Sequence, residues 1–157
     1  MKEYAKQEID GARDYFRSQG FEEVEANLGD FKFSYFVMPQ EMEPNLNNFV
    51  YRCTGKPEDG YVFGISDNVQ EEFRQYAVAH EFIEFMQIGL DQKDRCRKAL
   101  EREIELVPED IKSDYLSMRK DFFRDLIDYC SAKPEQYTQT DLDEFRGSLS
   151  KLEEIVK

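Results

Sequence analysis

Residues 61–89, YVFGISDNVQEEFRQYAVAHEFIEFMQIG, decide how the rest of the chain is interpreted. Aromatic and β-branched residues dominate positions 61–65, which is typical of a strand. Residues 66–68 (Ser-Asp-Asn) follow at once, and their side chains are well suited to cap the N-terminus of a helix. We therefore expect a short strand followed by a helix over residues 69–89.

That predicted helix is apolar around nearly its whole circumference between Tyr76 and Ile88, which is typical of a helix buried in a core. The same segment nevertheless holds His80, the only histidine of the chain, together with Glu81 and Glu84. Because positions i, i+1 and i+4 lie on one side of a helix, these three groups should be neighbours. A buried charge needs a partner, a metal ion or an open cleft. We therefore expect a functional site here.

A metal ion is the first partner to consider. His80 and Glu84 lie one helical turn apart and can bind the same ion, while Glu81 can act as a general base on a metal-bound water. A third ligand is expected from the next helix, over residues 91–107, where Glu103 falls beside the apolar stripe. That stripe comprises Cys96, Leu100, Ile104 and Val107. The expected cofactor is a divalent metal: zinc or, because two carboxylates are present, manganese or iron.

The motif HEFIE at residues 80–84 resembles the His-Glu-x-x-His helix of the zincin metallopeptidases. The similarity covers roughly residues 60–107. It includes a strand just before the helix, where zincins often have the edge strand of their sheet, and a glutamate on a later helix, as in the gluzincin subgroup. The resemblance implies a zincin-like fold and metal-assisted hydrolysis of a peptide or amide bond.

The same resemblance implies roles for individual residues. His80 would be the first metal ligand, Glu81 the general base and Glu103 the third ligand. Glu84 stands where the family has its second histidine, which makes the implied site more anionic. The resemblance thus implies either a variant site or a fold whose hydrolytic function is lost.

The same charges can also be satisfied without a metal. His80 could pair with a glutamate in the core, or either glutamate of the motif could pair with an arginine. The candidate arginines are Arg74, Arg95 and Arg102.

The charge of the chain limits its partners. The 34 acidic and 21 basic residues give a formal net charge of −13. Direct binding to nucleic acid or to an anionic membrane would require the opposite sign. The charge either keeps the protein in solution or forms an acidic surface for a basic protein partner. The second alternative predicts a non-enzymatic interaction protein, either a nucleic-acid mimic or a regulator.

The complete pattern predicts one α+β domain over residues 1–157, with an N-terminal helix, a small antiparallel sheet of three to four strands, and then a cluster of four helices. The expected helices cover residues 1–19, 69–89, 91–107, 108–131 and about 140–157. The expected strands cover residues 21–28, 31–37, 49–54 and 61–65, with a turn at 55–60.

Two further expectations concern side chains outside the motif. Cys53, Cys96 and Cys130 follow no metal-binding spacing and are expected to be reduced and mostly buried. Because residues 1–10 carry no secretory signal, the cytoplasm is the expected compartment. Large apolar residues form one stripe along the expected helix at 108–131. This stripe either packs in the core or binds a partner. We expect the solvated flank of that stripe to comprise Arg119, Lys120 and Arg124.

Overall fold

The computed structural model describes residues 12–54, 60–89 and 91–156. Over these residues the chain has five α-helices and one four-stranded sheet, so the predicted α+β class is confirmed. The predictions for residues 1–11 and for most of the turn, at 55–59, lie outside the described residues. None of the described helices combines the length and the apolarity needed to cross a bilayer.

The chain divides into two compact units, Met1–Val78 and Ala79–Lys157. The boundary lies within helix α3 (Glu71–Phe82), which begins in the first unit and ends in the second. Each unit is described by itself below. The expectation of a single domain stays a prediction.

In the first unit, helix α2 (Ala12–Ser18) ends at a glycine as expected. Gly20 has a φ of +81°, which favours glycine over residues with a side chain. The amide of Gly20 donates to the carbonyl oxygen of Arg17 at 3.0 Å, and the amide of Phe21 donates to that of Phe16 at 3.3 Å. This pair of bonds is a Schellman motif, so Gly20 is confirmed as the helix stop.

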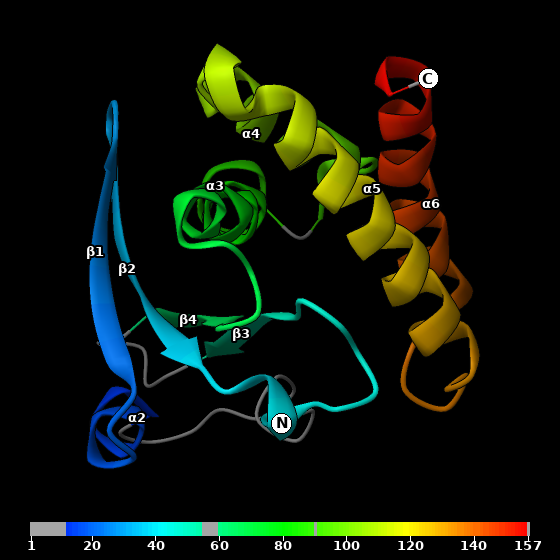
Figure 1. Cartoon of the computed structure of the whole chain (residues 1–157). Coiled ribbons are helices and arrows are strands. Elements are labelled where there is room, and N and C mark those ends of the chain that lie inside the picture. The colour runs from blue at the N-terminus through cyan, green and yellow to red at the C-terminus, as the bar shows by residue number, and fades with distance from the viewer. Residues whose placement is uncertain (1–11, 55–59, 90, 157) are drawn as a thin grey trace. The chain divides into compact units, whose positions relative to one another are not determined.

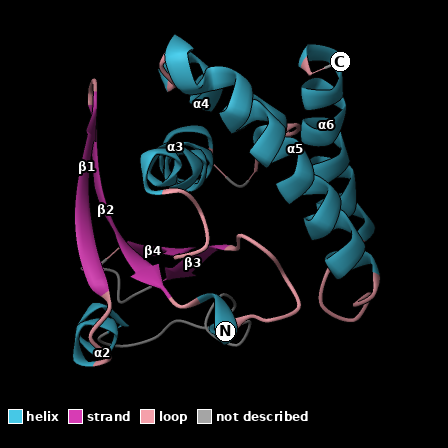
Figure 2. Ribbon diagram, viewed as in Figure 1, coloured by secondary structure: helices cyan, strands magenta, loops and turns pink. Residues whose placement is uncertain are grey.

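The sheet of the first unit has the strand order β1-β2-β4-β3 (Figure 2). Its strands are β1 (Glu22–Leu28), β2 (Phe31–Met38), β3 (Val50–Thr54) and β4 (Tyr61–Ser66). The β1–β2 hairpin is antiparallel, as expected, and so is the β3–β4 pair. The last four residues of β2, however, pair with β4 in parallel. The expectation of a purely antiparallel sheet is therefore wrong.

The position of β4 also differs from the expectation. β4 has β2 on one side and β3 on the other, so it is an inner strand and not the edge strand that the zincin resemblance implied. The long connection after β2 carries the chain past the place that β4 later fills, and β3 becomes the outer strand. Alternation of apolar residues defines which face a side chain takes, but it does not define the neighbouring strand.

Gly64 of β4 allows close packing against Met38 of β2. A Cβ atom at Gly64 would lie 2.6 Å from Sδ and 2.7 Å from Cε of Met38, whose side chain is fully buried. We expect Gly64→Ala to lower the free energy of unfolding by about 1 kcal/mol, because the flexible end of the buried Met38 side chain must shift to make room for the added methyl. Urea denaturation would measure the loss. Gly147→Ala is the control, because a Cβ atom added there would have nothing within 4 Å; an equal loss there would contradict the prediction.

The second unit continues from the end of α3 and consists of helices (Figure 1). They are the π-helix η2 (Ile83–Ile88), α4 (Arg95–Leu106), α5 (Glu109–Ser131) and α6 (Gln139–Ile155). Helix α6 packs against both α4 and α5. Its N-terminus has a reciprocal capping box between Thr138 and Asp141, so the helix begins slightly earlier than expected.

The helix predicted over residues 69–89 is α3 followed directly by η2. The segment Ile83–Ile88 is wound more loosely, and the amide of Gly89 donates to the carbonyl oxygen of Glu84, five residues earlier, at 2.9 Å. Gly89 then ends the segment with a φ of +98°. Single π-helical turns are rare and are frequently found at functional sites. This one contains Glu84.

Candidate metal centre

His80 lies in the last turn of α3 and is the centre of a buried polar cluster. Its side chain is only 3% exposed. Nδ1 lies 2.8 Å from Oε1 of Glu103, on α4. On the other edge of the ring, Nε2 lies 3.1 Å from Oε2 of Glu84 and 3.6 Å from Sγ of Cys96. The imidazole is therefore held from both sides.

Cys96 is positioned by helix α6. Its amide donates to Oε1 of Glu144 at 3.1 Å, and the amide of Asp94 donates to the other oxygen of the same carboxylate. One helical turn further along α6, the hydroxyl of Ser148 donates to Sγ of Cys96 at 3.0 Å. Glu144 thus caps the N-terminus of α4 and Ser148 holds the sulfur in place.

Glu84 has a charged neighbour besides His80. Nε of Arg95 lies 3.2 Å from Oε1 of Glu84, and both side chains are largely buried. The alternative that a glutamate of the motif pairs with an arginine is thus confirmed for Arg95. Arg74, another candidate, instead donates to two main-chain carbonyl oxygens of the first unit.

Glu103 is fully buried and is surrounded by donors other than His80. Arg119 of α5 donates from Nε to Oε2 at 2.8 Å and from Nη2 to Oε1 at 3.1 Å. The hydroxyl of Tyr115, one turn earlier on α5, donates to the same carboxylate. Such a two-pronged arginine–carboxylate contact fixes both planes relative to each other. Glu103 is therefore a rigid acceptor for Nδ1 of His80.

Arg119 was expected at the solvated flank of α5, and that prediction is wrong. Arg119 is only 1% exposed, and its guanidinium packs over the rings of Phe122 and Phe123 as well as against Glu103. The sequence did contain a signal for this position. Arg119 falls four residues after Tyr115 and four before Phe123, in the middle of the apolar stripe.

The neighbouring charges shift the pKa values of the cluster. Burial alone would lower the pKa of His80, but the Cys96 sulfur and the carboxylates of Glu103 and Glu84 favour the imidazolium and raise that pKa well above its ordinary value. Burial raises the pKa of the Cys96 thiol, although His80 acts in the opposite direction. Burial would also raise the pKa of Glu103, but Arg119 and His80 outweigh it and lower that pKa.

The structure brings three of the four predicted site residues together, with Cys96 in addition. Nε2 of His80, one oxygen of Glu84 and Sγ of Cys96 all lie within 4.8 Å of one another. Glu103 approaches the opposite nitrogen of His80 and is not part of that group. Glu81, the predicted general base, is half-buried next to His80 in the sequence. The described part of the chain thus offers a nitrogen, an oxygen and a sulfur ligand at one point.

Cys96 was expected from the sequence only as a member of the apolar stripe of α4. That stripe faces the core, so a thiol within it could have been added to the candidate ligands. None of the three cysteines forms a disulfide and all three are buried, as expected.

Comparisons of the chain with protein-family models, with curated proteins and with solved structures gave no match. The zincin-like fold and its catalytic assignments therefore stay predictions from the motif. The function has to be argued from the geometry of the site itself.

Proposed function

We propose that this protein binds a divalent transition-metal ion, with zinc preferred, through Nε2 of His80, a carboxylate oxygen of Glu84 and Sγ of Cys96. The observation that carries the proposal is the convergence of these three different ligand atoms within 4.8 Å, on side chains that are all buried. Each belongs to a residue type that binds zinc.

The distances suit a tetrahedral ion. With bonds of about 2.0 Å to nitrogen and oxygen and about 2.3 Å to sulfur, tetrahedral angles separate nitrogen and sulfur by about 3.5 Å and nitrogen and oxygen by about 3.3 Å. In the protein, Nε2 of His80 lies 3.6 Å from the Cys96 sulfur and 3.1 Å from the Glu84 oxygen. Two edges of the coordination tetrahedron are thus close to their required lengths.

The ligand types favour zinc over harder ions. Manganese and magnesium prefer oxygen ligands, whereas the thiolate of Cys96 and the imidazole of His80 suit zinc. The sequence suggested two carboxylates and one imidazole, which made manganese or iron plausible cofactors. Exchanging Glu103 for Cys96 in the ligand set moves the preference towards zinc.

In this proposal Glu103 is a positioning residue and not a ligand. Metal-binding histidines commonly donate their second ring N–H to a carboxylate, which fixes the orientation of the ring and makes it a stronger ligand. Glu103 occupies that place on Nδ1 of His80, and Arg119 and Tyr115 hold it there. Nε2 is left to face Glu84 and Cys96.

The total charge of the cluster also allows the ion. The carboxylates of Glu84 and Glu103 are balanced by Arg95 and Arg119. A zinc ion that replaces the Nε2 proton of the imidazolium and the proton of the Cys96 thiol leaves the summed charge unchanged. No additional charge has to be buried, so the desolvation cost that usually opposes placing an ion in a protein core does not increase.

The same contacts also describe a metal-free alternative, in which the His80 imidazolium bridges Glu84 and Glu103 as a structural ion network. That network would satisfy the buried charges by itself. The two alternatives differ in one measurable respect, since only the first requires the sulfur of Cys96.

Hydrolysis of a peptide or amide bond is a further proposal, which rests on the HEFIE motif and on Glu81. Three protein ligands are the usual number in catalytic zinc sites, which keep the fourth position for water. Substrate would have to reach the Nε2 edge of His80, and His80, Glu84 and Cys96 are all buried. The geometry therefore supports metal binding more strongly than turnover.

Metal loading of the chelator-treated protein tests the proposal. We expect stoichiometric zinc by mass spectrometry, and cobalt(II) should give the intense near-ultraviolet band of a thiolate–cobalt bond. Cys96→Ser should abolish that band and His80→Gln should abolish loading. Cys130→Ser removes a buried thiol outside the group and should change neither result.

Glu103→Gln separates positioning from coordination in the same assay. It should lower the affinity for zinc about 10–100-fold, as expected when a hydrogen-bond partner of a metal ligand is lost. The thiolate–cobalt band should remain. Negligible metal in both the unaltered chain and its Cys96→Ser form would favour the structural network and reject the metal site.

A further inference from the structure

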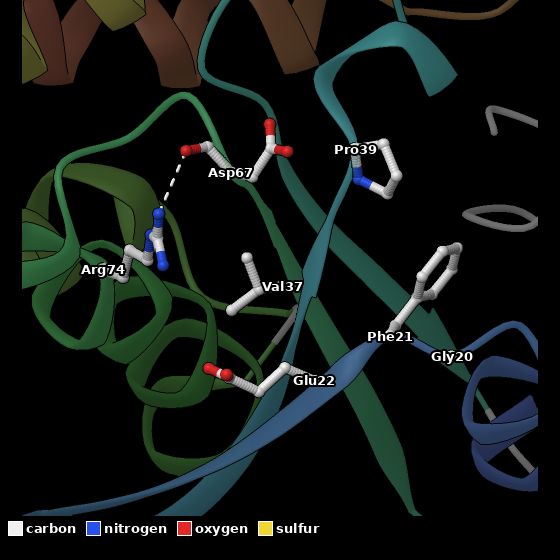
Figure 3. Close-up of a pocket in the computed structure, with 7 residues that line it drawn as sticks. All are labelled: Gly20, Phe21, Glu22, Val37, Pro39, Asp67 and Arg74. Atoms are coloured by element: carbon white, nitrogen blue, oxygen red, sulfur yellow. Dashed lines mark hydrogen bonds between the residues drawn. The ribbon is translucent and has the colours of Figure 1, made fainter.

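A second candidate site lies in the first unit. It is a pocket of about 370 Å³ where β1 begins and where β2 and β4 end (Figure 3). Three charged and three apolar side chains line it: Glu22, Asp67 and Arg74, and Phe21, Val37 and Pro39. Its volume falls within the usual range of small-molecule sites, roughly 300–1,000 Å³.

The place of the pocket in the sheet is one that proteins often use. β2 and β4 run in parallel, so their carboxyl ends lie side by side, and helix α3 starts shortly after β4. In parallel sheets, ligands commonly bind beyond the carboxyl ends of the strands, because loops and helix starts leave an open crevice there. The pocket thus lies where the unexpected parallel pair ends.

Arg74 of α3 supplies a fixed cation. Its Nε donates to the carbonyl oxygen of Val69 at 2.8 Å, and its Nη2 donates to that of Asp67 at 3.0 Å. Within the described part of the chain, Nη1 has no hydrogen-bond partner. A guanidinium held in this way has its remaining N–H groups aimed in a fixed direction, which suits a carboxylate.

Two carboxylates supply the opposite charge. Glu22 is exposed and forms no ion pair with the described residues. Asp67 accepts the amide of Gln40 on Oδ1 at 3.1 Å, which leaves Oδ2 for another donor.

The apolar residues form the other side of the pocket. Figure 3 shows the Arg74 guanidinium and the Glu22 carboxylate on one side of Val37, and the rings of Phe21 and Pro39 on the other. All three apolar side chains are partly exposed, so a ligand that covers them gains hydrophobic contact.

We infer that this pocket binds a small zwitterion with an apolar side chain, an apolar α-amino acid. Its carboxylate pairs with Arg74, its ammonium group pairs with Glu22, and its side chain packs on Val37, Phe21 and Pro39. A simple carboxylic acid would be repelled by the two carboxylates, and a simple amine would leave the Arg74 guanidinium desolvated and unpaired.

Leucine and two blocked derivatives test this inference on the full chain. Amide NMR spectra recorded during a leucine titration should show saturable shifts at residues 20–22, 37 and 67. Leucinamide lacks the carboxylate and N-acetylleucine lacks the ammonium group, and each should bind about tenfold more weakly or worse. Equal binding of either derivative would overturn the zwitterion assignment.

A pair of matched variants places the ligand. Glu22→Gln should lower the affinity for leucine about tenfold. Glu25→Gln, which is the same change at an exposed position of the same strand, should leave that affinity unchanged. The inference is wrong if leucine causes no saturable shifts, or if both variants weaken it equally. Zinc loading is a separate measurement, so this result does not depend on the metal site.

Discussion

Replacing Arg119 with methionine should lower the free energy of unfolding by about 3–5 kcal/mol, because it leaves the Glu103 carboxylate in the core without its strongest partner. Arg119 and Glu103 are both fully buried and joined by two hydrogen bonds. Methionine has a similar length and keeps the packing over Phe122 and Phe123. The loss thus reports on charge more than on volume.

Arg124→Met is the matched control for this prediction. Arg124 lies on the same helix, but its side chain is half exposed, and its ion pair with Glu153 is long, with 3.7 Å between Nη2 and Oε2. Loss of such a surface pair should change the free energy of unfolding by less than about 0.5 kcal/mol. Chemical denaturation of both variants measures the difference. The double variant Arg119→Met with Glu103→Gln should recover part of the loss, because no unpaired carboxylate then remains. A small effect of Arg119→Met would show that the ion pair is not as enclosed as its burial indicates.

Removing metal should cause the other large effect. A ligand that binds only the folded chain stabilises it by about 4 kcal/mol when its free concentration is about 1,000 times its Kd. We therefore expect zinc to raise the unfolding temperature of the chelator-treated protein and a chelator to reverse the change. The ion would join the end of α3, η2 and α4, so it should act on the second unit as a whole.

Two variants make this prediction specific. Cys96→Ser should lose the zinc-dependent rise in unfolding temperature, while Ser148 still has a hydroxyl to bond. Glu81→Gln changes a carboxylate of the same motif that is not among the converging ligand atoms, and it should keep the full rise. If zinc stabilised the Cys96→Ser protein as much as the unaltered chain, the stabilisation would come from binding elsewhere.

Local signals in the sequence were sufficient for most of the elements. Gly20 ends α2, the turn around Gly29 joins β1 to β2, and Pro108 separates α4 from α5, all as expected. Each of these depends on residues that are close in the sequence and on backbone angles that few residue types allow. Such signals identify elements well.

The order of the strands and the π-helix could not be predicted in this way. Pairing of β2 with β4 depends on how the intervening segment, which contains β3, folds back onto the sheet. The sequence pattern within either strand does not specify this pairing. The loosened winding of η2 likewise follows from the packing of a whole helix, whereas the apolar pattern of residues 83–88 fits an α-helix equally well.

The site was predicted in part. The periodicity of α3 and α4 was sufficient to bring His80, Glu84 and Glu103 together, because each was placed by the face of its own helix. It did not show which nitrogen of His80 each carboxylate would face. Cys96 was classed as apolar packing and Arg119 as solvated, although both occupy core positions in their stripes.

The π-helical segment Ile83–Ile88 has a consequence for how this site is formed. Insertion of one residue into an α-helix can be absorbed as a π-turn, so the same segment with one residue fewer would form an ordinary helix. Every later residue would then be rotated by about 100° around the helix axis. Exposed Met86 lies within this segment. Deleting one residue there would bring α4, and Cys96 with it, to His80 from another direction, so the contact between these two side chains depends on the length of η2.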